Sequence, residues 1–316
     1  MGYGKSGSTG LALAVASAAT FGTSGTFASS LLRAGWSPAA AVTARITIAA
    51  LVLTPFAVRQ QRGRWRDLRP ALPMIAVFGL VAIAACQLFY FNAVEHLSVG
   101  VALLLEYLGT VLVVGWVWLR HGQRPRRLTV LGAMVAVGGL VLVLDLVGSH
   151  HLDPVGVLWG LAAAAGLAVY FVLSARVDDA APPLVMAWGG MCVGSITLLL
   201  LDSVGLLHFH ASLHSVKLAG HQVSWLVPIL GLSVVAAAIA YLAGIAASRL
   251  LGARLASFIG LTEVVCAVLF AWLLLGQVPS TTQFLGGALI VAGVTLVRID
   301  ELTETAAPLD PVPVGG

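Results

Sequence analysis

Residues 98–119, SVGVALLLEYLGTVLVVGWVWL, form an unbroken apolar run that contains a single charged residue, Glu106. As a helix that rises 1.5 Å per residue, this run is about 33 Å long, which matches the roughly 30 Å hydrocarbon core of a bilayer. Arg120 follows directly and closes the run. The pattern therefore predicts a membrane-spanning helix.

Similar runs of about 18–24 residues recur along the chain, separated by short polar breaks. Helices are required because backbone amides in lipid must bond within their own segment, and the continuous runs lack the alternation of a β-barrel. Hydrophobic residues make up 59% of the chain and charged residues 9%, against about 25% in soluble domains. We predict an all-α polytopic membrane protein with ten transmembrane helices, at residues 9–32, 38–58, 71–93, 98–119, 128–146, 154–175, 183–202, 225–248, 254–275 and 281–298.

The positive charges gather on one side of these predicted spans. With the N-terminus in the cytoplasm, the outer loops hold only Arg33 and Lys217, and Arg45 falls inside a span. The other fourteen of the 17 Lys and Arg residues fall on the cytoplasmic side, as the positive-inside rule requires. We expect a multi-pass protein of a bacterial-type plasma (inner) membrane, with both termini cytoplasmic. Arginines that face anionic lipid between apolar runs also argue against nucleic acid as a partner.

The sequence also predicts an internal repeat. A shift of 154 residues superimposes a helix end, a Gly-Gln-x-Pro turn and a Gly-rich helix, aligning Trp118 with Trp272, Gly122 with Gly276, Pro125 with Pro279 and Gly139 with Gly293. Each half holds five spans, an odd number, so the second half enters the membrane from the opposite side, as in many transporters that work by alternating access. We predict five-helix repeats at 1–150 and 151–299 and a disordered cytoplasmic tail at 300–316. The Gly-rich helices that end the two halves should pack closely, within one subunit or between two.

Two segments carry a resemblance to a known family. Residues 90–93 with 98–109 resemble the third-to-fourth-helix signature of the EamA-like drug/metabolite transporter superfamily, and residues 261–277 resemble its repeat mate. The Glu before a Gly in the fourth helix is most similar to the threonine/homoserine exporter-like branch. The resemblance implies a secondary transporter that exports a small metabolite such as an amino acid or analogue. Thr110 and Val264 stand where family members often carry proline, which departs from the family pattern.

Three ionisable residues lie deep inside predicted spans: Arg45, Glu106 and Glu263. Each costs roughly 2.5–3.5 kcal/mol to insert at a helix centre, so each is a functional candidate, and all three fall near the bilayer midplane. The equal depth of Arg45 and Glu106 suggests an ion pair, either as a structural lock or as a counter-ion to a polar or zwitterionic substrate. For Glu263, proton coupling, a hydrogen bond to substrate and a structural role all stay open.

Polar and aromatic side chains on other predicted spans are candidates for the wall of a substrate site. Thr20 and Ser24 belong to a hydroxyl stripe on the first span, whose alternative role is helix packing. Gln87 and Tyr90 share a face of the third span. We predict a substrate-binding site made of Arg45, Glu106, Glu263, Gln87, Tyr90, Thr20, Ser24, Thr110, Tyr170 and Tyr241.

The sequence lacks the usual signatures of catalysis and of cofactor binding. No nucleophile elbow, P-loop or HExxH occurs, so ATP bound to this chain cannot drive transport. His208, His210, His214 and His221 are more typical of a solvated loop than of a zinc site. We predict a non-enzymatic transporter without metal or cofactor, whose partners are a small-molecule substrate, membrane lipid and, as an option, a second copy in a homodimer. The alternatives are a membrane-embedded lipid-modifying enzyme and a membrane partner that transports nothing.

Overall fold

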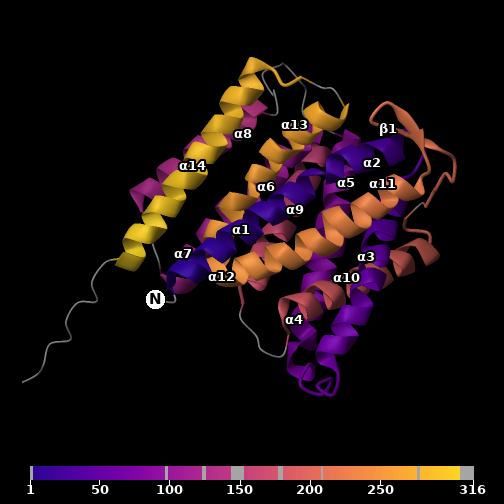
Figure 1. The fold of residues 1–316 in the computed structure, drawn as a ribbon, viewed down its shortest axis with the longest axis horizontal. Coiled ribbons are helices and arrows are strands. Elements are labelled where there is room, and N and C mark those ends of the chain that lie inside the picture. Colours follow the sequence, from indigo (N-terminus) through magenta and orange to yellow (C-terminus); the bar gives the residue numbers. More distant parts are fainter. Residues whose placement is uncertain are drawn as a thin grey trace, which may run out of the picture.

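The computed structural model describes residues 3–96, 99–122, 126–143, 153–176, 181–207, 209–275 and 278–306. Over these residues the chain is a bundle of helices with one short hairpin (Figure 1). The elements are α1 (Tyr3–Gly22), α2 (Ser24–Arg33), α3 (Pro38–Gln61), η1 (Arg69–Ala71), α4 (Leu72–Val77), η2 (Phe78–Ala85), α5 (Cys86–His96), α6 (Val99–Tyr107), α7 (Gly109–His121), α8 (Arg127–Val143), α9 (Pro154–Ser174), α10 (Pro183–Ser203), β1 (Val216–Leu218), β2 (His221–Val223), α11 (Leu226–Leu230), η3 (Gly231–Ile239), α12 (Ala240–Gly260), α13 (Thr262–Leu275) and α14 (Thr281–Ala306).

Seven helical segments of the described chain are long and apolar enough to cross a membrane, and two shorter apolar helices accompany them. The longest, Leu226–Gly260, has 35 residues and is broken at Gly252, whose φ of 80° is not helical. The remainder of that segment leads into α13. The prediction of an all-helical polytopic membrane protein is confirmed, whereas the count of ten spans stays a prediction. The seven segments are Gly7–Arg33, Pro38–Gln61, Arg69–Ala93, Ala102–Arg120, Pro154–Ser174, Pro183–Ser203 and Leu226–Gly260.

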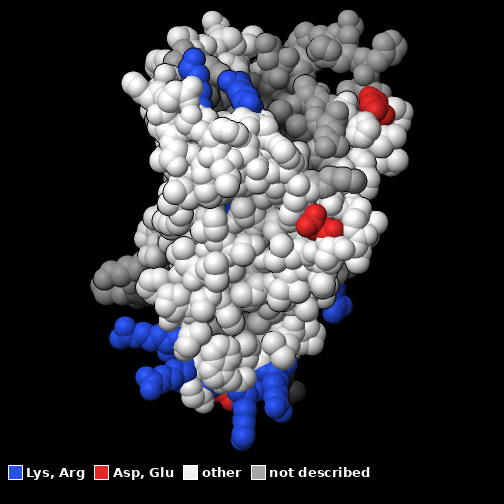
Figure 2. Space-filling model, turned by 90° about the vertical axis from the view of Figure 1, so that its right-hand side faces the viewer, with Lys and Arg blue, Asp and Glu red and all other residues white. Residues whose placement is uncertain are grey.

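The outer surface carries large apolar side chains where a soluble protein would carry charge. Leu51, Leu119 and Leu158 are 66%, 85% and 69% exposed. Figure 2 shows the middle of one face with few charged residues; Lys and Arg lie at its two ends, most of them at the lower end, where α3 leads into α4 in Figure 1. Such a surface is stable only in contact with lipid, so the protein is an integral membrane protein.

Several long helices are interrupted beside the cavity described below. Between α6 and α7, the amide of Leu108 is shared by the carbonyl oxygens of Leu104 and Leu105, at 3.3 and 3.1 Å. Another interruption falls at Leu261, between α12 and α13. The segments η2 and η3 are π-helical, a wider turn that is frequent at functional sites. These irregular turns place the polar residues of α5, α6 and α13.

The connection after α10 contains a β-hairpin. β1 and β2 pair antiparallel through a turn at Ala219 and Gly220, whose φ values of 50° and 81° suit the tight turns of hairpins. This loop is held against the start of α3, because the Trp36 indole N–H donates to the Ser212 carbonyl oxygen at 2.7 Å. The predicted outer segments 33–37 and 203–224 therefore meet at one end of the bundle.

Helices α8 and α14 lie side by side (Figure 1). Their approach requires glycine, since a Cβ on Gly132 would lie 2.7 Å from the Gly293 carbonyl oxygen. A Cβ on Gly139 would lie 2.6 Å from the carbonyl oxygen of Gly286. The predicted close packing of these two helices is confirmed, and the contact is made within one chain.

Helix α14 continues beyond the predicted end of the last span. It runs to Ala306, so the prediction of a disordered tail from residue 300 is wrong for its first part, and residues 307–316 lie outside the described residues. Asp300 is only 6% exposed, because it packs against α8 and its carboxylate accepts a hydrogen bond from the Thr129 hydroxyl. This contact with α8 stabilises the helix at Asp300, where the acidic, proline-rich composition of the tail predicted disorder.

Candidate substrate site

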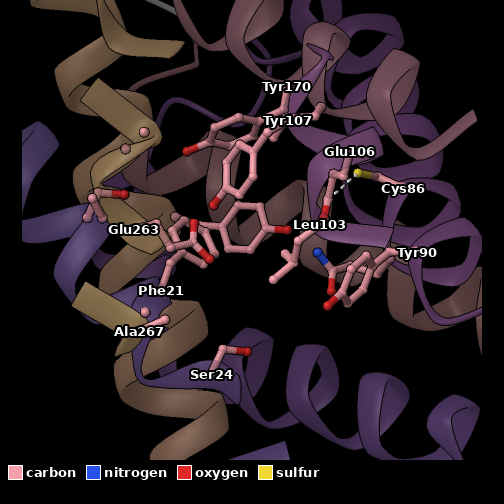
Figure 3. A pocket seen from close by; sticks show the side chains of 18 of the residues that line it. Phe21, Ser24, Cys86, Tyr90, Leu103, Glu106, Tyr107, Tyr170, Glu263 and Ala267 are labelled. Atoms are coloured by element: carbon pink, nitrogen blue, oxygen red, sulfur yellow. Dashed lines mark hydrogen bonds between the residues drawn. The ribbon is translucent and has the colours of Figure 1, made fainter. Parts of the chain in front are cut away.

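A cavity of about 220 Å³ lies among α1, α2, α3, α5, α6, α9, α12 and α13. Helices α1 and α2 line one part of the cavity, from Ala14 to Leu32. Figure 3 shows Glu106 and Cys86 on one wall, Glu263 on the opposite wall, and Tyr107 and Tyr170 between them. The helices that form it are far apart in sequence, so only the folded bundle creates this space.

Eight of the ten predicted substrate-site residues line this cavity, among them all three residues chosen for the cost of burying them. Their role in binding a substrate stays a prediction. The eight are Ser24, Arg45, Gln87, Tyr90, Glu106, Tyr170, Tyr241 and Glu263.

Arg45 on α3 is 4% exposed and is held by two neighbours. One terminal nitrogen, Nη1, donates to the Gln87 side-chain oxygen at 3.3 Å, and the other, Nη2, donates to the Ala236 carbonyl oxygen at 2.5 Å. The third donor, Nε, has no hydrogen-bond partner in the described chain. The suggested ion pair with Glu106 is not formed within 4.0 Å among the described residues, because Gln87 and the backbone of η3 bind the guanidinium instead.

Glu106 lies on α6, two residues before the interruption at Leu108. The Cys86 thiol is 3.6 Å from its carboxylate and 3.4 Å from the Ala163 carbonyl oxygen. Cys86 is absent from the predicted site, although it precedes Gln87 and lies one helical turn before Tyr90. That shared face of α5 was the signal that would have placed it at the site.

Glu263 lies in the first turn of α13, directly after the interruption at Leu261. Its carboxylate interacts electrostatically with Arg45 and Glu106 as well as with Tyr107. The cavity thus contains one guanidinium and two carboxylates that act on one another. That arrangement can bind a ligand carrying both charges.

Aromatic side chains complete the wall. The Tyr170 and Tyr241 rings are perpendicular with centroids 5.5 Å apart, and the Phe21 and Tyr241 rings meet edge to face at 5.0 Å. The Tyr170 hydroxyl is buried without a hydrogen-bond partner in the described chain. Gly244 makes room for it, since a Cβ there would overlap that hydroxyl. The cavity therefore holds two unmet donors, the Tyr170 hydroxyl and the Arg45 Nε.

The sequence matches the EamA-like transporter family over residues 8–145 and 154–299, nearly the whole chain. The chain belongs to this family. This confirms the resemblance drawn from residues 90–109 and 261–277, and the EamA-like chain is a membrane transporter.

The EamA-like chain is also similar to individual proteins. It is 29% identical, over 84% of its length and 85% of the relative's, to a probable terminal-alkyne amino-acid exporter of Streptantibioticus cattleyicolor. It is 27% identical, over 80% of its length and 83% of the relative's, to an uncharacterized transporter of Archaeoglobus fulgidus. A crystal structure with 22% identity covers 95% of this chain, and 99% of that one, with a TM-score of 0.75, which shows the fold alone.

Two predicted residues of this EamA-like chain lie away from the cavity. The Thr20 hydroxyl donates back to the carbonyl oxygens of Ala16 and Ser17, at 2.8 and 3.0 Å. Thr110 is fully buried and donates to the Tyr107 carbonyl oxygen at 2.9 Å. The Thr20 hydroxyl bonds within α1, which is its packing alternative, and the Thr110 hydroxyl bonds across the joint between α6 and α7. Neither residue lines the cavity.

The loop histidines form no metal site in the described part of the chain, where no group of three His, Cys, Asp or Glu residues could hold an ion. His208 lies outside the described residues. The His214 ring nitrogen Nδ1 is 3.0 Å from the Ser212 hydroxyl. This loop therefore gives no support to the lipid-modifying enzyme.

A polar contact outside the spans joins the ends of α5 and α9. The His96 Nδ1 is 2.8 Å from the Asp153 carboxylate. Asp153 also caps α9 by accepting from the Val155 amide at 2.9 Å. The Val155 amide first, and His96 second, lower the pKa of the Asp153 carboxyl below its ordinary 3.8.

Proposed function

We propose that this chain is a secondary transporter that exports a small zwitterionic metabolite, such as an amino acid or analogue, by alternating access through the central cavity. The observation that carries the proposal is the meeting of Arg45, Glu106 and Glu263 around one cavity inside a membrane bundle. Buried ionisable groups are expensive in a membrane and mark substrate and ion pathways. A charged cavity supports transport over a purely structural role.

The donors and acceptors of the cavity suit a zwitterion. A substrate carboxylate would accept from the unmet Arg45 Nε and the Tyr170 hydroxyl. A substrate ammonium would donate to the carboxylate of Glu106 or of Glu263, which line the same cavity. The cavity volume of about 220 Å³ is below the roughly 300–1,000 Å³ of pockets for drug-sized ligands, which favours a small ligand. The relative named an amino-acid exporter points to the same class of substrate.

We further propose ten spans arranged as two inverted five-helix repeats, at 1–150 and 151–299. The helix interruptions at Leu108 and Leu261 are 153 residues apart, and the π-helical segments η2 and η3 begin at Phe78 and Gly231, also 153 residues apart. Irregularities at a constant spacing support the repeat that the 154-residue shift predicts. The paired last helices, α8 and α14, are equivalent in the same scheme.

The proposed orientation places both termini and the arginine-rich loops in the cytoplasm of a cell with an inner membrane. Three predicted cytoplasmic connections lie at one end of the bundle: the Trp65 ring is 6.0 Å from the Trp188 ring, and Arg249 donates to the Ala181 carbonyl oxygen at 2.5 Å. The hairpin and the start of α3 meet at the other end. This arrangement supports the threading inferred from the positive charges.

Flux through proteoliposomes tests the proposal. Glu106→Gln and Arg45→Ala should each lower counterflow of a stabilising amino acid at least tenfold, since each removes a charge from the cavity. Asp202→Asn and Arg33→Gln remove the same charges outside the cavity and should leave flux unchanged. Wild-type flux in both cavity variants would refute the assigned site. The amino acid for this assay is chosen by a screen for compounds that raise the melting temperature of the protein, because a bound ligand stabilises the native state by mass action.

A further inference from the structure

A second pocket, of about 610 Å³, lies where the ends of α7 and α9 meet the break in α12 at Gly252. It shares no lining residue with the central cavity. Three arginines from three separate elements line it: Arg120, Arg176 and Arg254. Arg120 is the last residue of one membrane-spanning segment, and Arg176 lies just after the end of another, at Ser174. The pocket therefore lies at the boundary between the apolar belt and the polar end of the bundle.

The charged residues among the described lining of this pocket are all arginines, and none of that lining is acidic. Arg120 and Arg176 are exposed, and neither side chain forms a hydrogen bond or ion pair within the described part of the chain. Guanidinium groups that converge from different helices repel one another unless an anion lies between them. Their planar forks suit the oxygens of a phosphate better than those of any neutral ligand.

The other half of the pocket is apolar and opens onto the lipid-facing surface. Trp116 lines the pocket one turn before Arg120 and is 44% exposed. On the same face of α7, Leu112 is 47% exposed and Leu119 is 85% exposed. A free phosphate would use only the arginines, whereas an amphiphile would use the arginines and this apolar strip together.

We propose that this pocket binds an anionic phospholipid, with the phosphate among Arg120, Arg176 and Arg254 and an acyl chain along Trp116 and Leu112. Basic pockets between helices on the side rich in Lys and Arg are where such headgroups are expected. Helix α7 begins directly after the interruption at Leu108, and α12 is broken at Gly252, so the bound lipid ties together two helices that line or adjoin the central cavity.

The test uses the full chain in mild detergent, with phosphatidylglycerol, phosphatidylcholine and inorganic phosphate as separate additions. We expect phosphatidylglycerol to raise the melting temperature by several degrees, with little effect of phosphatidylcholine at the same mole fraction. Arg120→Gln with Arg176→Gln should weaken phosphatidylglycerol binding by about 30-fold, since each arginine contributes roughly a factor of five near an anionic headgroup. The matched control, Arg59→Gln with Arg62→Gln, removes two charges from another basic loop and should retain wild-type binding.

Three outcomes would overturn the proposal. Equal stabilisation by both lipids would show that charge is not recognised, and equal binding by the Arg120/Arg176 double variant would place the lipid elsewhere. Stabilisation by millimolar inorganic phosphate as strong as that by lipid would assign the pocket to a free anion. Arg120→Lys with Arg176→Lys keeps the charges and should retain part of the binding, which separates loss of an anion site from loss of fold. None of these measurements involves transport, so their failure leaves the proposed function untouched.

Discussion

Replacing Arg45 with glutamine separates a ligand-binding role from a structural one. Each terminal guanidinium nitrogen already uses one of its two N–H groups, for Gln87 and for Ala236, and the Nε–H bonds to nothing in the described chain. At least one charge-assisted hydrogen bond to a ligand carboxylate, from Nε, is therefore at stake. Such a bond contributes about 1.5–3 kcal/mol, which corresponds to a loss of roughly 10- to 150-fold in affinity.

The assay compares three ligands by equilibrium binding: an amino acid that stabilises the protein, its decarboxylated amine and its deaminated acid. Arg45→Gln should weaken binding of the amino acid and of the acid by that factor and leave the amine unchanged. Glu106→Gln should do the reverse, weakening the two ligands that carry an ammonium group. Equal losses for all three ligands in Arg45→Gln would refute direct contact and leave Arg45 a structural residue.

Arg45→Lys is the companion variant for stability, because it keeps the charge but cannot reach Gln87 and Ala236 together. If Arg45→Lys binds the amino acid within a few-fold of wild type while Arg45→Gln does not, the positive charge matters more for ligand affinity than the planar shape of the guanidinium. If neither variant shows a melting transition, the hydrogen bonds from Arg45 to Gln87 and Ala236 are needed for folding.

Three further predictions concern packing, access and pH. Gly139→Ala should lower the melting temperature by several degrees, because its Cβ would lie 2.6 Å from a backbone oxygen of α14 and overpacking costs about 1–3 kcal/mol, whereas Gly138→Ala, beside it, meets open space and should be neutral in thermal unfolding. Cys86 lines the cavity and Cys192 does not, so bound ligand should slow alkylation by N-ethylmaleimide at Cys86 alone, and mass spectrometry showing equal protection of both would contradict the placement. Asp153→Asn keeps the helix cap but removes the charge; since the pKa of Asp153 is lowered in the folded protein, wild type should be the more stable at pH 7, and the difference in melting temperature should vanish as pH falls below 3.8 and the carboxylate is protonated.

The membrane-spanning character and the ionisable residues of the cavity were predictable from the sequence. An apolar run of span length admits only a helix in lipid, and a charge inside it is costly enough to mark a function. That argument alone selected Arg45, Glu106 and Glu263, and the fold brings them to one cavity. The prediction that they share a depth stays a prediction.

Depth does not give the direction in which a side chain points around its helix. Arg45 and Glu106 are predicted at one depth, yet Arg45 bonds to Gln87 and the η3 backbone. Thr20 belongs to the same hydroxyl stripe as Ser24, but it bonds to its own helix while Ser24 lines the cavity. Helix breaks such as that at Leu108 shift the facing of later residues and leave little trace in hydropathy.

The shared amide at Leu108 has a mechanical meaning for the carboxylate two residues before it. An intact helix resists bending because each turn would have to give up a well-formed hydrogen bond, but here the bond is already divided between two carbonyl oxygens. Bending between α6 and α7 at this joint therefore breaks no well-formed backbone hydrogen bond. The same bend would move the Glu106 side chain further than an uninterrupted helix allows. A cavity-lining carboxylate thus lies two residues from a joint at which its helix can bend at little cost.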